Sequence, residues 1–212
     1  MSCDTPSAGT APGATPVPTG HMAVQPSSLY VASPVMLLAT LNPDGTPNLA
    51  PASSYWALGS MACLGLEDGG QTYENLQSRP EITINFPSPQ LLSAVGRLAG
   101  TTGRNPVPAA KAAHHRYVHD KFGEAGLTPE ASELVDPPRV AECMVQMEAA
   151  VRHDRRGVGA YHIVEVEVLR VWAAPQIVAD DGTNIASDTW QPCLDVFRRF
   201  YGVDSATEYR LH

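Results

Sequence analysis

The stretch PVMLLATLNPDGTPNLAPASSYW, residues 34–56, decides the fold class. An apolar run ends at residues 42–45, NPDG, which is a strong signal for a β-hairpin turn. A second strand is then expected through residues 47–56. Its end is unusual, because the small hydroxyl residues Ser53 and Ser54 stand between a proline and an aromatic pair. Small side chains leave backbone exposed, so this segment is suited to lie against a flat or anionic ligand.

Further short strands follow from alternating apolar residues, which have the period of a half-buried strand. They are expected at residues 60–67, 81–86, 143–151 and 161–172. Helices are expected at residues 71–79 (closed by Pro80), 88–99 (Ser88 as N-cap), 108–122 (alanine-rich) and 191–200. Neither GxGxxG nor a Walker A pattern is present. We therefore predict a mainly β (α+β) fold, a barrel-like sheet with inserted helices in one domain at residues 28–212.

Composition excludes several classes of protein. With 14 Lys and Arg against 22 Asp and Glu, the formal charge is −8, which disfavours a nucleic-acid partner. No apolar run reaches the ~18 residues of a membrane span. The four cysteines form no CxxC pair, which indicates the reducing cytoplasm. Residues 1–27 are rich in Pro, Thr, Gly and Ala without signal-peptide features, so we expect a disordered tail.

Two sets of polar residues suggest an anion site. Asn48, Ser53 and Ser54 end one strand, while Thr72 and Asn75 lie at a predicted helix start, where free N–H groups favour a phosphate. The alternative is that the serines are strand-edge residues and Thr72 is only an N-cap. His115 and His119 have a zinc-compatible spacing, but no third ligand is evident and we predict no metal site.

The chain resembles the flavin reductase-like family, whose fold is the FMN-binding split β-barrel. Residues 34–56, QTYENL (71–76) and EITINF (81–86) resemble the front half of the family, with its N-x-x-P-x-S, D-T-x-x-N and V-N-x-P patterns. Residues 121–149, 161–172 and 188–202 resemble the back half. The match runs in order from about residue 30 to residue 203.

The resemblance implies an oxidoreductase that binds FMN, takes hydride from NADH or NADPH, and passes electrons to free flavin or a partner monooxygenase. FAD in place of FMN stays open, as does the choice of nucleotide. It also implies a homodimer, with a C-terminal helical arm at the interface. The flavin-binding residues that it implies are Asn48, Ala50, Pro51, Ser53, Ser54, Tyr55, Thr72, Asn75 and Asn85. His162 would bind the nicotinamide, or else be a hydrogen-bonded strand histidine.

Two departures from the family pattern keep alternatives open. Gly69, Gly70 and Gln71 stand where the family often has a basic and an acidic residue before the threonine, so Arg97 or Arg104 would have to substitute. Residues 159–162 read GAYH where reductases often have G-D-H. A flavin-binding electron carrier or sensor without NAD(P)H reductase activity is the alternative function, and a split barrel that binds another ligand is a third.

Overall fold

The computed structural model describes residues 20–203 of the chain. Most of the predicted disordered tail, and residues 204–212, lie outside the described residues. Residues 20–27 are exposed and contain no helix or strand. The first strand pairing begins shortly afterwards, at β1 (Ser33–Pro34).

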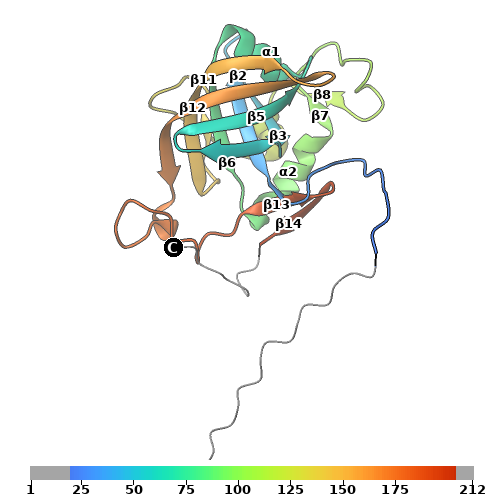
Figure 1. Cartoon of the computed structure of the whole chain (residues 1–212). Helices are drawn as coiled ribbons and strands as arrows, with labels where there is room; N and C mark the ends of the chain where they lie inside the picture. Colours follow the sequence, from blue (N-terminus) through green and yellow to red (C-terminus); the bar gives the residue numbers. More distant parts are fainter. Residues whose placement is uncertain (1–19, 204–212) are drawn as a thin grey trace, which may run out of the picture.

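A seven-stranded antiparallel sheet forms the body of the molecule (Figure 1). Its strands in spatial order are β3 (Pro47–Ala52), β2 (Met36–Leu41), β6 (Glu81–Phe86), β11 (Val145–Arg156), β12 (Tyr161–Ala173), β5 (Met61–Glu67) and β4 (Tyr55–Leu58). The two outermost strands, β3 and β4, are consecutive in sequence and only Ser53 and Ser54 separate them. The sheet must therefore curl until its edges meet at this link, as the predicted split barrel requires.

Two hydrophobic clusters explain why β2 is a continuous apolar run without alternating polar residues. Met36 and Leu38 of β2 face the inside of the curled sheet, together with Ile82, Ile84 and other buried residues. The opposite face of β2 packs under α2 (Leu92–Ala99) and α3 (Lys121–Ala125). A strand buried on both faces has no solvent-facing positions, so it reads as a continuous apolar run.

The first two predicted helices are confirmed. α1 (Gln71–Ser78) ends just before Pro80, which cannot continue a helix. A 3-10 turn at Pro89–Leu91 leads into α2, and Ser88 lies at its N-cap position, although its side chain makes no capping hydrogen bond.

The predicted helix at residues 108–122 is wrong. That segment contains turns, the short strand β8 (Arg116–Tyr117) parallel to β7 (Thr101–Thr102), and the start of α3. Alanine favours helix locally, but the segment has few large apolar residues to pack, and most helical stability comes from a packed apolar face. Asp120 begins α3 instead, accepting a hydrogen bond from the Gly123 N–H at 2.8 Å.

The predicted C-terminal helix at residues 191–200 is also wrong. β13 (Cys193–Val196) and β14 (Arg199–Gly202) form a hairpin that pairs with β1, below α2 in Figure 1. Phe197 and Arg198 form the two-residue turn with φ of 48° and 68°, the left-handed conformation that tight hairpins need. The expected C-terminal helical arm is therefore a β-hairpin.

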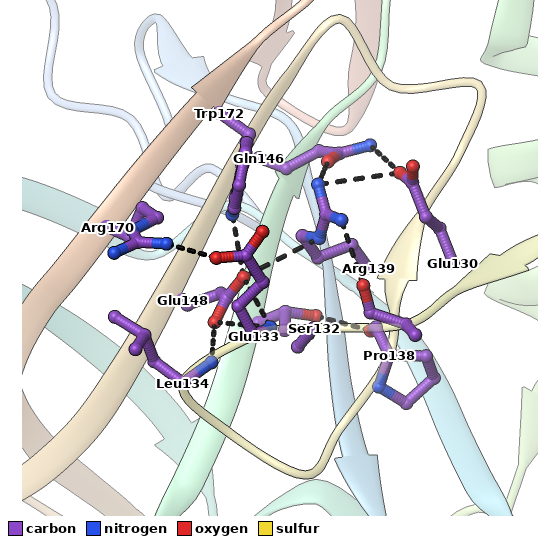
Figure 2. A network of polar contacts seen from close by, with 12 residues as sticks. Glu130, Ser132, Glu133, Leu134, Pro138, Arg139, Gln146, Glu148, Arg170 and Trp172 are labelled. Carbon is purple, nitrogen blue, oxygen red and sulfur yellow. Dashed lines mark hydrogen bonds and ion pairs between the residues drawn. The ribbon is translucent and has the colours of Figure 1, made fainter.

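A buried ionic network fixes the loop between β9 (Pro129–Glu130) and β10 (Arg139–Val140) on the sheet (Figure 2). Glu148 of β11 is fully buried, and its carboxylate accepts hydrogen bonds from the Leu134 N–H and from Trp172 Nε1, each at 2.6 Å. The Arg139 guanidinium lies 4.5 Å from the centre of the Trp172 ring, with Nε 3.6 Å from the Glu148 carboxylate. Desolvation raises the pKa of Glu148, but these donors outweigh it and the pKa is lowered.

Candidate functional site

One cavity of about 670 Å³ lies where the two edges of the curled sheet meet. The β3–β4 link, the end of β5, the start of α1, β7 and the tip of the β11–β12 hairpin all contribute to its wall. That volume is within the range of small-molecule and cofactor sites. Its wall combines elements that are far apart in sequence, so the curling of the sheet is what creates it.

Seven of the predicted site residues line this cavity. They come from three places: the end of β3 with its link to β4, the first turn of α1, and the start of β12. The seven are Asn48, Ala50, Pro51, Ser53, Ser54, Thr72 and His162. The structure therefore brings these seven residues to one cavity.

The other three predicted site residues do not line the cavity. Tyr55 packs edge-on against Phe86, with ring centres 5.5 Å apart. Asn75, a residue of α1, is buried and donates to Thr40 Oγ1 of β2 at 2.9 Å. Asn85 lies in the middle of the sheet, where it donates to the Leu37 carbonyl of β2 and accepts from the Val140 N–H of β10. The two asparagines satisfy buried polar groups of the fold, and Tyr55 packs against the core.

The start of α1 is open toward the cavity. Gly70 is the N-cap and makes no side-chain capping bond, so Thr72 is a first-turn residue rather than the cap. The Thr72 hydroxyl accepts a hydrogen bond from Asn48 Nδ2 at 3.2 Å. N–H groups of a first helical turn carry partial positive charge and suit an anion.

Lys121 is the basic group that the sequence interpretation missed. It lines the cavity and is only 2% exposed, and its Nζ donates to Thr101 Oγ1 at 2.6 Å. Among residues 20–203, no carboxylate oxygen lies within 4 Å of this nitrogen. Desolvation lowers the pKa of Lys121 to about 8. A buried cation without a carboxylate is a natural partner for an anionic ligand.

Lys111 stands at the same cavity, where it forms an ion pair with Glu67 at 2.5 Å. The two arginines proposed as substitutes lie elsewhere. Arg97 donates to the carbonyl of Ala125, and Arg104 pairs with Glu74 at 2.8 Å beside a neighbouring pocket. Neither arginine therefore lines the main cavity, whereas Lys111 and Lys121 do.

His162 is held in a small polar cluster at the cavity wall. Its Nδ1 lies 3.1 Å from Asp154 Oδ1, and the Tyr73 hydroxyl donates to Asp154 Oδ2 at 2.8 Å. The rings of Tyr73 and His162 are 4.0 Å apart between centres. Burial raises the pKa of Asp154, but the hydrogen bonds from Tyr73, Gln77 and His162 outweigh it and the pKa is lowered. Burial, with Asp154 beside it, raises the pKa of Tyr73 to about 12.

Two glycines allow close approaches at the cavity wall. A Cβ at Gly65 would lie 2.8 Å from Ser54 Cβ, and one at Gly103 would lie 2.6 Å from Asn48 Oδ1. Real Cβ atoms essentially never make contacts that short, so β5 approaches Ser54 closely, and the chain after β7 approaches Asn48 closely, only because each carries glycine there. Small side chains on both sides shape the cavity wall.

Two other kinds of site were tested within the described part of the chain. No group of three or more His, Cys, Asp or Glu residues is placed to hold a metal ion there. His119 pairs with Asp44 at 2.9 Å, and the segment that carries it is not helical, so the zinc-like spacing with His115 does not arise. Within residues 20–203, none of the helices has the length and apolar composition needed to cross a bilayer.

Comparison with known proteins agrees with the fold. The protein YdfE of Bacillus subtilis (strain 168) is 37% identical over 183 residues, covering 85% of this chain and 88% of YdfE. Flavoredoxin of Desulfovibrio vulgaris (Miyazaki F) superposes with a TM-score of 0.73 at 22% identity, covering 91% of this chain and 97% of flavoredoxin. Nitrilotriacetate monooxygenase component B from Bacillus cereus superposes with a TM-score of 0.72 at 15% identity, covering 92% and 100%. The flavin reductase like domain model matches residues 28–203, and the chain belongs to this family.

Proposed function

We propose that this protein binds FMN in the cavity and catalyses hydride transfer from NAD(P)H to the flavin, which passes electrons to free flavin or to a partner protein. The observation that carries the proposal is Lys121, a buried cation without a carboxylate partner, beside the open start of α1. A phosphate supplies the charge that this position lacks.

The residues present suit each part of FMN. Lys121, Lys111, Thr72 and the first-turn N–H groups of α1 would hold the phosphate. The β3–β4 link, with Ser53 and Ser54 among its polar groups, would contact the rest of the cofactor. A bound flavin supplies the redox chemistry, and the protein supplies binding and orientation.

FAD is the alternative cofactor because of a neighbouring pocket. A pocket of about 680 Å³ between α1 and the loop after β7 shares Gln71 with the main cavity. Its volume is large enough for a further nucleotide portion. Comparing the two dissociation constants, FMN against FAD, decides between them.

The electron acceptor is proposed from the relatives' names. Nitrilotriacetate monooxygenase component B belongs to a monooxygenase system, which favours a partner monooxygenase that uses reduced flavin. The altered G-D-H pattern before His162 favours the second candidate, a flavin-binding electron carrier or sensor without NAD(P)H reductase activity. Reduction by NAD(P)H separates the two.

We also propose a cytoplasmic homodimer. Trp56 and Leu58 of β4 are 51% and 73% exposed, and Val171 of β12 is 50% exposed. Large apolar side chains gathered on strands are typical of a surface that a second subunit covers. Cys63, Cys143 and Cys193 are free and buried, which suits a reducing compartment.

The test is an anaerobic titration of the protein reconstituted with FMN, adding NADH and, separately, NADPH. Bleaching of the flavin absorbance within seconds supports the reductase. Tight FMN binding without bleaching by either nucleotide rejects the reductase in favour of the carrier. Failure to bind FMN or FAD rejects the whole proposal.

A further inference from the structure

The His162 ring is fixed by side chains from two other elements. In the β11–β12 ladder His162 is opposite Arg156, and Asp154 lies two residues before Arg156, on the same face of β11. Such diagonal neighbours are within reach of long or aromatic side chains. The Tyr73 ring, from α1, stacks against the imidazole with an angle of 31° between the ring planes. The imidazole therefore has little freedom to rotate.

Asp154 determines which ring nitrogen carries the proton. Three donors converge on its two oxygens: the Tyr73 hydroxyl, the Gln77 amide at 3.0 Å and His162 Nδ1. An ionised carboxylate only accepts hydrogen bonds, so Nδ1 must carry the proton in this contact. In a neutral imidazole the other nitrogen, Nε2, is then an acceptor.

The Nε2 atom is the part of the ring left for a ligand. His162 lines the cavity, and within residues 20–203 its Nε2 has no hydrogen-bond partner. Backbone carbonyl groups of the hairpin are acceptors too, but His162 Nε2 belongs to a ring that the Asp154 carboxylate orients from the other side. A ligand with an N–H donor, such as a carboxamide, complements it.

We propose that Asp154 and Tyr73 are positioning residues that hold His162 with Nδ1 protonated, so that Nε2 accepts a hydrogen bond from the carboxamide of the nicotinamide of NAD(P)H. This inference rests on the proposed function. The residue before His162 is Tyr161, and the carboxylate that contacts the His162 ring comes from the neighbouring strand.

The tautomer is tested first, by ¹⁵N NMR of the histidine-labelled full chain at a pH where the ring is neutral. His162→Ala identifies the His162 signals. We expect a protonated Nδ1 and an unprotonated Nε2 in the wild type. In Asp154→Asn the amide can donate to Nδ1, so a large share of the ring should shift to the Nε2–H form. A wild type with the proton on Nε2, or an Asp154→Asn variant with the wild-type tautomer, overturns the proposal.

Kinetics test the carboxamide contact. Asp154→Asn should raise the KM for NADH about fivefold to tenfold, the effect of about one hydrogen bond, with kcat within about twofold. Glu167→Gln is the matched control, because it removes a carboxylate of the same hairpin that pairs with the exposed Arg152. It should leave KM unchanged. Tyr73→Phe, which keeps the stacked ring, should have a smaller effect than Asp154→Asn.

Failure of the inference and failure of the proposed function are distinguishable. A wild type that binds no FMN, or is not reduced by NADH, rejects the function, while the NMR experiment still reports the tautomer. Normal wild-type reduction and FMN affinity, with an unchanged KM in Asp154→Asn, reject the positioning role alone.

Discussion

Two buried cations in this protein have opposite surroundings. Arg139 lies with a buried carboxylate, Glu148, and over the Trp172 ring (Figure 2). Lys121 is equally inaccessible, but its partner is a neutral hydroxyl. Desolvating a charge is expensive unless an opposite charge or donors and acceptors compensate for it. The first cation is compensated within the fold, and the second is left for a ligand.

The difference between the two cations indicates that the Arg139–Glu148 network contributes to stability, whereas Lys121 is placed for ligand binding. The Glu148 network fastens a loop to β11 and lies away from the cavity, since none of its residues lines it. Among the residues that the structure describes, Lys121 forms no ion pair that would fasten a loop. The desolvation of its charge lowers the stability of the ligand-free protein. Substitutions at the two positions should therefore have opposite consequences for stability and for ligand affinity.

The largest expected effect is on stability. Glu148→Gln replaces a carboxylate, which only accepts hydrogen bonds, with an amide whose NH2 group would face the N–H donors. It also leaves Arg139 with the more exposed Glu130, 3.5 Å away, as its counter-charge. Removing one partner of a buried pair costs about 3–5 kcal/mol of unfolding free energy, measurable by urea denaturation. Glu133→Gln, whose carboxylate is half exposed and pairs with Arg170, should cost under about 1 kcal/mol. Equal effects of the two substitutions would mean that the network does not fasten the loop.

Substitution of the second cation should affect the ligand instead. Lys121→Met keeps the length and removes the charge, so the dissociation constant for FMN should rise by about 30-fold or more, the effect of losing a buried charged partner. The free protein should be no less stable than the wild type. Fluorescence quenching of FMN and urea denaturation measure the two quantities.

Lys111→Met is the control for that substitution. Lys111 already pairs with Glu67 and its side chain is 22% exposed, so its loss should weaken FMN binding less. A Lys121→Met variant that binds FMN like the wild type would remove the observation on which the proposed function rests.

The lowered pKa of Lys121 should make the affinity for FMN depend on pH. Desolvation lowers it to about 8, below the ordinary value of 10.5, so the free protein loses this proton as the pH rises through about 8. FMN affinity should then fall above pH 8, by at most about tenfold per pH unit for one coupled proton. Titrations between pH 7 and 9.5 measure it, and Lys121→Met should lack this component.

Stability should change with pH in the opposite sense. Between about pH 8 and 10.5 the unfolded chain binds more protons at Lys121 than the folded protein does, so this residue makes the FMN-free protein more stable as the pH rises. The difference in unfolding free energy between wild type and Lys121→Met isolates this contribution. A difference that falls over this range would contradict the lowered pKa.

Local patterns were enough to predict most strands. Alternation in β6 and β12, and the turn between β2 and β3, depend on neighbouring residues and are readable from the chain. The segments at residues 108–122 and 191–200 failed because local helix propensity competed there with pairing to β7 and β1, which no nearby residue reveals.

The site divides in the same way. Asn48, the Ser53–Ser54 pair and Thr72 belong to compact motifs, and they line the cavity. Asp154 meets His162 only through the register of a long hairpin, and Lys121 reaches the cavity from the start of α3. The K-F pair that contains Lys121 was visible in the sequence, but spacing alone does not show that its ammonium group is buried without a carboxylate.

The smallest expected effect on FMN binding is that of Arg104→Gln, which tests whether the phosphate binds in the main cavity or in the neighbouring pocket. Arg104→Gln removes a cation that already pairs with Glu74 and lines the neighbouring pocket rather than the main cavity. A partly exposed, paired charge contributes little at a distance, so the dissociation constant for FMN should change by less than about twofold in the same fluorescence titration. A loss as large as that of Lys121→Met would place the phosphate toward the neighbouring pocket. Arg104, which is paired and partly exposed, would then be the functional cation, and the difference between Lys121 and Arg139 would not explain binding.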